Sequence, residues 1–551
     1  MTSLLPDIEA LSLQQQVAQM LVVRASGYLF DHQIQYPVWE PTAAMLRHWV
    51  ETLGVGGVIL LGGSAGEVAL RSQQLQAWAT IPLLVAADVE EGVGQRFSGA
   101  TWFPPPMALA AVAQNFPDRA ERYAEQLGDT TAQEARAIGL NWVLAPVVDV
   151  NNNPDNPVIN VRSFGETPAI VSQLTTAFLR GAQRHSVLTS AKHFPGHGDT
   201  AVDSHLELPV LAHARDRLAQ IEIPPFKAAI AAGVDAVMSA HLQIPALDPE
   251  FPATLSPRIL TQELRQALGF DGLIVTDALV MGAIANRYGA NEAAVLAVEA
   301  GADILLMPLD PDGAIQALCE AVEMGRIAAD RIQSSVERIW RAKYKVCASV
   351  QGDTSHTWET LSSVGIETQA LTAQLAQPQA QAMVAAIVRN SMQMQCPDHS
   401  RLTQARWSCD RRNLIIVDDL LAGEGLGRHT PAIALPQELG YALQLVDRHT
   451  PPIALNKEMS TWQPTLLQLF IRGNPFRGSA GLTQTAIDWF HFLVESDQLL
   501  ALVLYGSPYV LDKFLPTLPA DVPYVFTYGQ MPSAQAIALE FLSDGLGLNA
   551  H

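Results

Sequence analysis

Residues 192–205 bring together side chains that can move protons and bind polar ligands. The segment reads Lys-His-Phe-Pro-Gly-His-Gly-Asp-Thr-Ala-Val-Asp-Ser-His. Its glycines and proline interrupt regular structure directly after an apolar run, so we expect a loop that follows a strand. Loops of this kind often hold functional residues on a rigid scaffold. The composition therefore predicts a functional loop and not a part of the packed core.

Asp203 and His205 lie two positions apart in this loop and can form a carboxylate–imidazole pair. A histidine with an ordinary pKa of about 6.5 can donate and accept a proton near neutral pH. Asp203 would orient the ring and stabilise its protonated form. We therefore predict His205 as a proton shuttle, with an exposed, solvated loop histidine as the alternative.

Asp277 ends the apolar run 273–279, which begins after the turn residues Asp271 and Gly272. A carboxylate at the end of a rigid strand is well placed to act as a fixed nucleophile. The alternative for this position is a helix N-cap. The spacing predicts Asp277 as a candidate catalytic residue.

Eight short runs rich in Val, Ile and Leu alternate with helical stretches in the first two thirds of the chain. Such continuous apolar runs are typical of parallel strands that are covered on both faces. We expect strands at residues 20–25, 57–62, 83–88, 142–150, 188–194, 236–242, 273–279 and 303–308.

Polar residues stand at the carboxyl ends of five different runs: Asp88, Asp149, His193, His241 and Asp277. The carboxyl ends of the strands meet on one face of a closed barrel, whereas they spread along an edge in an open sheet. Eight β-α units in about three hundred residues fit the barrel. The pattern predicts a (β/α)8 TIM-type barrel over residues 1–349.

After the barrel, a stretch rich in Gln, Ala, Ser and Thr predicts a linker region at residues 350–378. Residues 379–551 are expected to form a smaller C-terminal α/β sandwich domain whose role the sequence does not reveal. Its predicted strands are residues 414–419, 466–472, 500–508 and 524–529.

The net charge of -21 over 551 residues disfavours nucleic acid and anionic membranes as partners. The N-terminal residues lack the pattern of a signal peptide, and no run approaches the length of a membrane span. We therefore expect a cytoplasmic protein. Its four cysteines form no metal-binding or disulfide pattern and are expected to be reduced.

The segment 192–205 resembles the pattern KH[FI]PG[HN]G, four residues, then D[ST]H. This pattern marks the bacterial β-N-acetylglucosaminidase branch of the family 3 glycoside hydrolases. Residues 156–165, 238–241 and 269–272 resemble the same branch, and the resemblance extends over about residues 10–345.

The resemblance implies a retaining enzyme, with Asp277 as the nucleophile and the Asp203 and His205 dyad as the general acid and base. It implies a small carbohydrate substrate, an N-acetylglucosaminide, and muropeptide fragments of the cell wall as its source. It implies no cofactor and no metal. The substrate-binding residues that it implies are Asp88, Arg96, Arg162, Lys192, His193 and His241.

One loop departs from the family pattern D-x-EGGRV-x-R. Here it reads Asp-Val-Glu-Glu-Gly-Val-Gly-Gln-Arg from Asp88 to Arg96. The two end residues are kept, whereas Glu91 and Val93 replace a glycine and an arginine. The local conformation of this loop is therefore a question for the structure.

Four other functions compete with this interpretation. A family 3 β-glucosidase would take its acid/base from a carboxylate outside the loop, which the intact residues 203–205 argue against. A barrel that binds sugar without catalysis and a phosphorylase with phosphate as acceptor are further alternatives. A metal-dependent hydrolase is the fourth, with candidate ligands His193, His197, Asp199, Asp203, His205 and His241.

Overall fold

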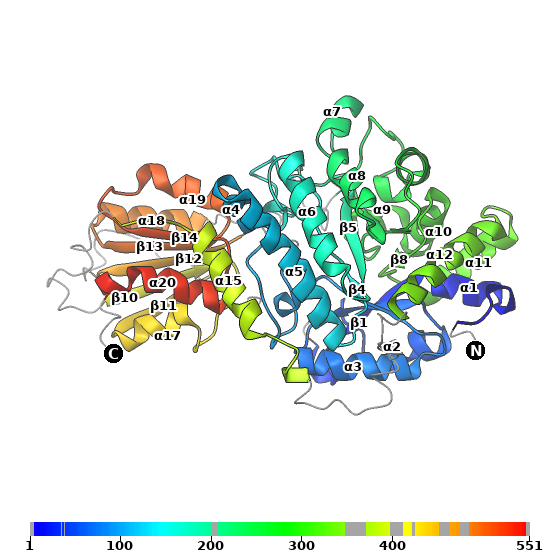
Figure 1. Ribbon diagram of the computed structural model, residues 1–551, viewed down its shortest axis with the longest axis horizontal. Coiled ribbons are helices and arrows are strands. Elements are labelled where there is room, and N and C mark those ends of the chain that lie inside the picture. The colour runs from blue at the N-terminus through cyan, green and yellow to red at the C-terminus, as the bar shows by residue number, and fades with distance from the viewer. Residues whose placement is uncertain are drawn as a thin grey trace.

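The computed structural model describes two α/β units joined side by side (Figure 1). The residues that it describes are 5–34, 36–37, 39–200, 208–347, 371–396, 411–420, 425–450, 463–472 and 484–546. The predicted dyad Asp203 and His205 lies outside the described residues.

Eight parallel strands of the described chain form the first sheet, with β2 to β7 following one another in order. All eight predicted barrel strands are confirmed, although several are shorter than predicted. They are β1 (Leu21–Ser26), β2 (Gly57–Leu61), β3 (Leu84–Ala87), β4 (Trp142–Val143), β5 (Leu188–Phe194), β6 (Ala236–Ser239), β7 (Leu273–Val275) and β8 (Leu305–Leu306).

The sheet closes on itself through β8. On one side β8 pairs with β1, where Leu305 aligns with Leu21. On the other side Val275 of β7 forms a parallel bridge with Ile304. The backbone N–H of Leu306 also donates to the Thr276 side chain at 2.9 Å. The predicted (β/α)8 barrel is thus the observed architecture.

Helices surround the barrel (Figure 1). The α-helices are α1 (Leu13–Gln19), α2 (Ala43–Arg47), α3 (Ala65–Trp78), α4 (Met107–Asn115), α5 (Pro117–Ala137), α6 (Pro168–Ala182), α7 (Arg215–Gln220), α8 (Ile223–Ala231), α9 (Gly282–Tyr288), α10 (Ala290–Ala300), α11 (Pro311–Glu323) and α12 (Ala329–Cys347). The 3-10 or π-helical segments are η1 (Ile8–Ala10), η2 (Asp31–Gln33), η3 (His48–Thr52), η4 (Val93–Gln95), η5 (Asn160–Arg162), η6 (Ala253–Leu255) and η7 (Arg258–Ala267).

Local sequence explains where several of these helices begin. Ser64 caps α3, because its hydroxyl accepts from the backbone N–H of Glu67 while the Glu67 carboxylate accepts from the backbone N–H of Ser64. This reciprocal pair satisfies two backbone donors that the helix itself leaves unpaired. Asp310 caps α11 in a similar way, with Pro311 at the first helical position.

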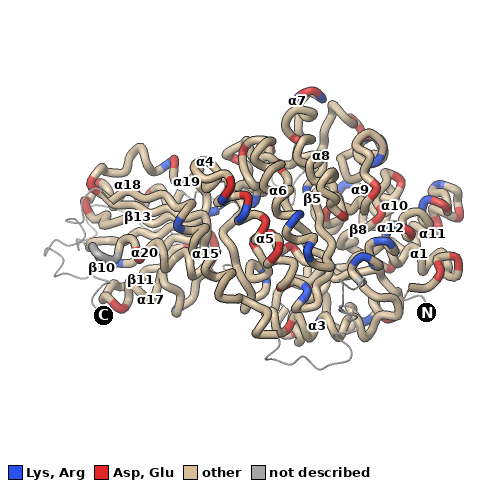
Figure 2. The backbone as a smooth tube through the Cα atoms, in the orientation of Figure 1, with Lys and Arg blue, Asp and Glu red and all other residues tan. Residues whose placement is uncertain are grey.

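Charged residues of both signs lie side by side on the outer helix α5 (Figure 2). Arg180 of α6 pairs there with Glu121 and Glu125 of α5 at 2.9 and 2.8 Å. Because these side chains are partly exposed, such pairs contribute little to stability. They connect neighbouring helices and give the barrel a polar exterior.

The second sheet has the strand order β11-β10-β12-β13-β14-β9 within the described residues. All its neighbours are parallel except β14 and β9. The strands are β9 (Gln393–Gln395), β10 (Arg411–Val417), β11 (Tyr441–Val446), β12 (Thr465–Ile471), β13 (Leu499–Gly506) and β14 (Tyr524–Thr527). The helices of this unit are α15 (Pro378–Ser391), α17 (Pro431–Glu438), α18 (Gln484–Glu495), α19 (Pro508–Phe514), η8 (Leu515–Thr517) and α20 (Pro532–Leu546).

Alternate residues of these strands pack against opposite helices. Ile415 of β10 belongs to a cluster with residues of α17 and α20, whereas Leu414 and Ile416 belong to the core that includes α18 and α19. Side chains alternate between the faces of a strand, so both faces of the sheet are covered. The predicted smaller α/β sandwich is confirmed.

Two strands of this sheet were missed by the sequence analysis, namely β9 and β11. Both lie at its edges, and β9 is exposed along its whole length. The sequence of β9, QMQ, has the few apolar residues that an edge strand needs, whereas β11, YALQLV, is largely apolar and was still not recognised. The linker predicted at residues 350–378 falls mostly outside the described residues, and the domain boundaries stay a prediction.

Within the described residues, no helix combines the length and the apolar composition that crossing a bilayer requires.

Candidate active site

The predicted site residues of the described chain lie on the carboxyl side of the barrel strands. Asp88 directly follows β3, Lys192 and His193 lie near the carboxyl end of β5, His241 follows β6, and Asp277 follows β7. Active sites of (β/α)8 barrels lie on this face. The closed barrel therefore brings together residues that are nearly two hundred positions apart in the sequence.

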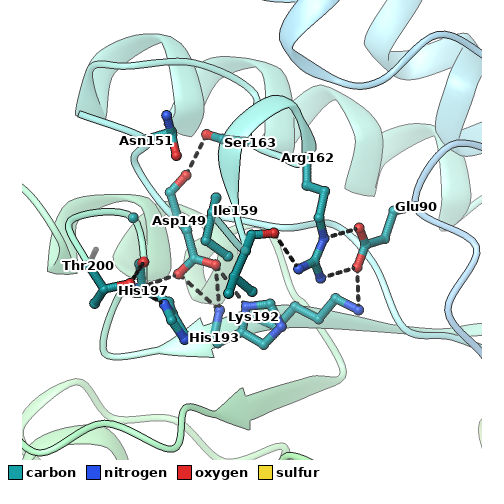
Figure 3. A network of polar contacts seen from close by, with 12 residues as sticks. Glu90, Asp149, Asn151, Ile159, Arg162, Ser163, Lys192, His193, His197 and Thr200 are labelled. Atoms are coloured by element: carbon teal, nitrogen blue, oxygen red, sulfur yellow. Dashed lines mark hydrogen bonds and ion pairs between the residues drawn. The ribbon is translucent and has the colours of Figure 1, made fainter. Parts of the chain in front are cut away.

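Lys192 lies at the centre of a buried ion-pair network (Figure 3). Its Nζ atom is 2.6 Å from Oδ1 of Asp88 and 2.6 Å from Oε1 of Glu90. Arg162 binds Glu90 through two hydrogen bonds of 2.8 Å. Bidentate pairs of this type are strong and fix the orientation of both groups. We call these four residues the charged cradle.

Charge balance keeps the cradle ionised in spite of its burial. Burial by itself lowers the pKa of Lys192, but the nearby charges of Asp88 and Glu90 raise it above its usual value. Burial raises the pKa of Glu90, but Arg162 and Lys192 hold it well below the usual range. Asp88 has the most exposed side chain of the four, at 28%, compared with 12% for Arg162. The cradle thus presents fixed charges to a polar ligand at its Asp88 edge.

A second buried network surrounds Asp149, which follows β4 (Figure 3). Its carboxylate accepts from Nδ1 of His193 at 2.8 Å and from the backbone N–H of His197 at 2.7 Å. Burial raises the pKa of Asp149, but the charge of His193 and these hydrogen bonds lower it below its usual value. An ionised Asp149 therefore fixes the His193 ring with its Nδ1 as the donor.

The loop after β5 is packed closely against the loop after β4. Asn156 donates from its side-chain amide to the backbone oxygens of His197 and Gly198 at 2.9 and 3.0 Å. A Cβ atom on Gly198 would lie 1.8 Å from the backbone oxygen of Val150, so only glycine fits there. The start of the predicted functional loop is thereby held in one conformation.

Asp277 is partly buried, and its Oδ1 atom accepts from the backbone N–H of Ala278 at 2.8 Å. His241 is fully buried, with Nδ1 2.8 Å from the Thr254 hydroxyl and Nε2 3.1 Å from the backbone oxygen of Ala278. His241 therefore supports the segment that follows Asp277. This position is consistent with a supporting role in the wall of the site.

Asp277 is also electrostatically coupled to the network around Asp149. Burial lowers the pKa of His197 to about 4, while the charges of Asp149 and Asp277 act in the opposite direction. Since charge interactions weaken with distance, the carboxylate of Asp277 belongs to the same region of the face. The predicted nucleophile thus lies within electrostatic range of His197, which follows the predicted sugar ligand His193 in the same loop.

Arg96 differs from the other predicted ligands, because its side chain is exposed. Its Nε atom donates to the backbone oxygen of Asp88 at 3.1 Å. The contact joins the two ends of the loop whose sequence departs from the family pattern. Arg96 therefore lies next to the cradle but outside its ion pairs.

Sequence reasoning did not assign a role to Glu90, Asp149 or His197 in sugar binding. Glu90 and Asp149 are buried charges that orient the predicted ligands. The sequence analysis singles out Asp149 only by its position at the end of an apolar run, and position is also the available signal for Glu90, which follows β3 closely. Within the described residues, no group of three or more His, Cys, Asp or Glu could hold a metal ion, and two candidate ligands of the metal alternative, Asp203 and His205, lie outside them.

The family of the chain follows from comparison with known proteins. The pattern of the Glycosyl hydrolase family 3 N terminal domain matches residues 12–342. The chain belongs to glycosyl hydrolase family 3. The pattern of the Bacterial Glycosyl hydrolase family 3 C-terminal domain matches residues 404–544, within which lie most of the strands of the second sheet.

Individual relatives show how far the similarity extends. A β-hexosaminidase A from Pseudoalteromonas piscicida is 36% identical over 55% of this chain and 55% of its own. A β-N-acetylglucosaminidase/β-glucosidase from Cellulomonas fimi is 34% identical over 54% of each chain. The chain thus spans about half the length of these two relatives.

A solved structure is similar over both units. The family 3 β-N-acetylglucosaminidase from Paenibacillus sp. str. FPU-7 is 30% identical, with a TM-score of 0.72. The similarity covers 98% of this chain and 97% of that one. The arrangement of a barrel followed by a smaller α/β sandwich is therefore shared with this family 3 structure.

Proposed function

We propose that the protein is a retaining β-N-acetylglucosaminidase that releases terminal N-acetylglucosamine from small glycosides. The observation that supports it best is the convergence of Asp277 and the charged cradle on one face of the barrel. This family 3 chain also has relatives whose names include β-hexosaminidase and β-N-acetylglucosaminidase. The loop motif of residues 192–205 adds the acid/base pair that this reaction requires.

In the proposed reaction the Asp277 carboxylate attacks the anomeric carbon of the sugar. His205 donates a proton to the leaving oxygen, and a covalent glycosyl-enzyme ester on Asp277 forms as the glycosidic bond breaks. His205 then accepts a proton from water, which attacks the same carbon and releases Asp277. Two inversions at that carbon retain its configuration.

The cradle would bind the sugar in the cleavage position. Asp88 accepts hydrogen bonds from ring hydroxyls, while Lys192, Arg162 and Arg96 donate to hydroxyl or acetamido oxygens. His193, oriented by Asp149, offers its second ring nitrogen to the same ligand. A neutral histidine base also avoids a second negative charge beside Asp277, in contrast to glycosidases that use two carboxylates.

A fluorinated N-acetylglucosaminyl donor tests the proposed reaction directly. We expect mass spectrometry to find a covalent label on Asp277, and Asp277→Ala to lower kcat on the order of 10⁴-fold or more. Asp271→Ala is a matched control, because Asp271 is an exposed carboxylate just before the same strand β7. Near-normal turnover by Asp277→Ala would disprove the assignment.

Substrate choice is tested with nitrophenyl N-acetylglucosaminide and nitrophenyl glucoside. We expect the first to have the higher kcat/KM, and a preference for the glucoside would favour the β-glucosidase alternative.

His205→Ala should slow the hydrolysis of substrates with poor leaving groups most, because those leaving groups need protonation. Full activity after exhaustive chelation would exclude the metal-dependent alternative.

The proposal includes muropeptide fragments as the natural substrate and the cytoplasm as the place of action. Purified disaccharide muropeptides should lose N-acetylglucosamine on incubation with the protein, which chromatography of the products would show. Cell fractionation tests the location. Failure of the muropeptide assay with an active enzyme would confine the proposal to simpler N-acetylglucosaminides.

A further inference from the structure

The second sheet contacts the barrel next to the charged cradle. Arg472 directly follows β12, and Tyr509 lies in α19, which follows the neighbouring strand β13. Arg472 contacts the loop after β3, and Tyr509 contacts the loop after β4. Ligands of open α/β sheets commonly bind beyond the carboxyl ends of the strands. In this protein the active-site loops of the barrel meet residues from that edge.

Arg472 forms a close pair with Glu91. One guanidinium nitrogen is 2.6 Å from Oε1 of Glu91, and the other is 3.3 Å from Oε2. The Glu91 carboxylate also accepts from Nε1 of Trp102 at 3.0 Å. Glu91 is completely buried, so its carboxylate depends on these partners for compensation of its charge.

Glu91 is the neighbour of Glu90, which holds both cations of the cradle. The loop between them and Phe103 is folded back on itself, since the backbone N–H of Phe103 donates to the oxygen of Glu91 at 2.8 Å. Gly92 adopts a φ of +87°, and a Cβ there would lie 2.6 Å from the backbone oxygen of Thr101. A shift of Glu91 would therefore move Glu90 with it.

The Glu91 position is one of the departures from the family pattern, which has glycine at this place. A glycine has no side chain that could pair with Arg472. The ion pair is therefore tied to the particular form of the loop in this chain. The loop from Asp88 to Arg96 is therefore fixed here by a contact that the family pattern does not predict.

The loop after β4 is held from the same edge. The Tyr509 hydroxyl donates to Oε1 of Glu166 at 2.6 Å and accepts from Nδ2 of Asn151 at 3.0 Å. Asn151 in turn accepts from the backbone N–H of Asn160 at 2.8 Å, at the start of the turn that holds Arg162. Both loops that supply the Glu90 and Arg162 pair are thus anchored to the second sheet.

We propose that Arg472 is a positioning residue for sugar binding, which acts on the charged cradle through Glu91. The inference rests on the proposed function for its effect on catalysis. The second sheet then has a defined role, because it fixes the conformation of the loop that contains Glu90. It contributes through Arg472 without direct contact between Arg472 and the sugar.

The test compares variants of the full-length protein. Arg472→Met combined with Glu91→Gln removes both charges at similar volume, so neither charge is left buried alone. Arg472→Lys is the conservative variant. Arg119→Met is the control, because Arg119 also joins the two units, through Asn390 at 3.2 Å, but contacts neither loop of the cradle. Two measurements follow for each variant, namely amide hydrogen exchange of residues 88–103 and the hydrolysis of nitrophenyl N-acetylglucosaminide.

We expect faster exchange of residues 88–103 in the double variant and kcat/KM lowered on the order of 10- to 100-fold, mainly through KM. Arg472→Lys should recover part of this loss, and Arg119→Met should match the wild type in both measurements. Unchanged exchange in the double variant would overturn the positioning role. So would unchanged rate constants in an otherwise active enzyme.

A wild-type protein that hydrolyses no glycoside would instead overturn the proposed function. The exchange measurement does not depend on turnover, so it would still decide whether Arg472 orders the loop. The two failures are therefore distinguishable.

Discussion

Two buried carboxylates at opposite ends of the barrel, Asp303 and Glu90, resemble one another in their chemistry. Asp303 precedes β8 and is in contact with Arg265, Arg331 and Arg338 at 2.6, 3.4 and 3.1 Å. Glu90 follows β3 at the other end and pairs with two cations of the cradle. Both are arginine-bound acids with less than 5% of their surface exposed.

The charge balance around the two groups differs. Three guanidinium groups share Asp303, and burial lowers the pKa of Arg265 and Arg331. Around Glu90, the two cations Arg162 and Lys192 also interact with the charge of a second acid, Asp88. Burial lowers the pKa of Arg162, but Glu90 and Asp88 raise it above its usual value. At the amino end of the barrel, the charges around Asp303 connect neighbouring elements of the fold. At the carboxyl end, the cradle has two acids and two cations on the face where such barrels bind their ligands.

Removal of the Asp303 charge should have the largest effect on stability. Asp303→Asn leaves three partly buried guanidinium groups without a counter-charge, so we expect a loss of about 3–5 kcal/mol in the free energy of unfolding. Urea denaturation measures this loss. The specific activity of the folded protein should stay close to that of the wild type.

Arg326→Ala is the control for this substitution. Arg326 also binds two carboxylates, Glu292 and Glu299, but at the surface, where such pairs contribute about 1 kcal/mol or less. Equal losses of unfolding free energy in Asp303→Asn and Arg326→Ala would contradict the distinction between the buried charges around Asp303 and the exposed ion pairs.

The His197 pKa of about 4 predicts a dependence of stability on pH. Between pH 6.5 and 4 the unfolded chain binds a proton at His197, whereas the folded protein keeps this buried ring neutral. Stability should therefore fall as the pH falls through this window, by about 3 kcal/mol from His197 alone. Denaturation at several pH values in wild type and His197→Asn measures the contribution. Parallel curves for the two proteins would refute it.

Glu90→Gln should affect activity more than Asp303→Asn does. The substitution keeps the shape but removes the charge that orients Arg162 and Lys192, so we expect kcat/KM to fall about 100-fold. Steady-state kinetics with nitrophenyl N-acetylglucosaminide provide the measurement. Asp303→Asn is the matched control, because it removes the charge of one buried carboxylate at the other end of the barrel. A larger loss of kcat/KM in that variant would reverse the comparison.

Tyr509→Phe should have the smallest effect. Loss of its hydrogen bonds to the loop after β4 is expected to cost about 1 kcal/mol and to raise KM by a factor of a few. Tyr123→Phe is the control, because the Tyr123 hydroxyl accepts from Asn390 across the same pair of units, away from the cradle. Equal KM values in the two variants would show that Tyr509 does not order the cradle.

The sequence predicted the barrel strands well because most of them are short apolar runs, although β5, LTSAKHF, also contains polar residues. The edge strand β9 was missed because it is short and polar, whereas the edge strand β11 was missed although its sequence, YALQLV, is largely apolar. Asp88, Lys192, His193 and Asp277 were predicted as site residues from their positions at strand ends and from a specific motif, and the structure places them on the carboxyl side of the barrel strands. Asp149 was noted at a strand end but was given no role, and Glu90 and Arg472 were not assigned, because the partners of these buried charges come from distant parts of the chain.

The sequence alone determined the order of the β-α units, the position of reactive side chains at strand ends and the motif of residues 192–205. These features are local, since they depend on residue types and spacing over short stretches. Tertiary structure decided which charges pair, because Glu90 meets Lys192 and Arg162 only after the barrel closes. It also decided that Arg472, 381 residues after Glu91, neutralises this buried acid. Burial makes such distant pairs matter, since a charge removed from water needs a partner.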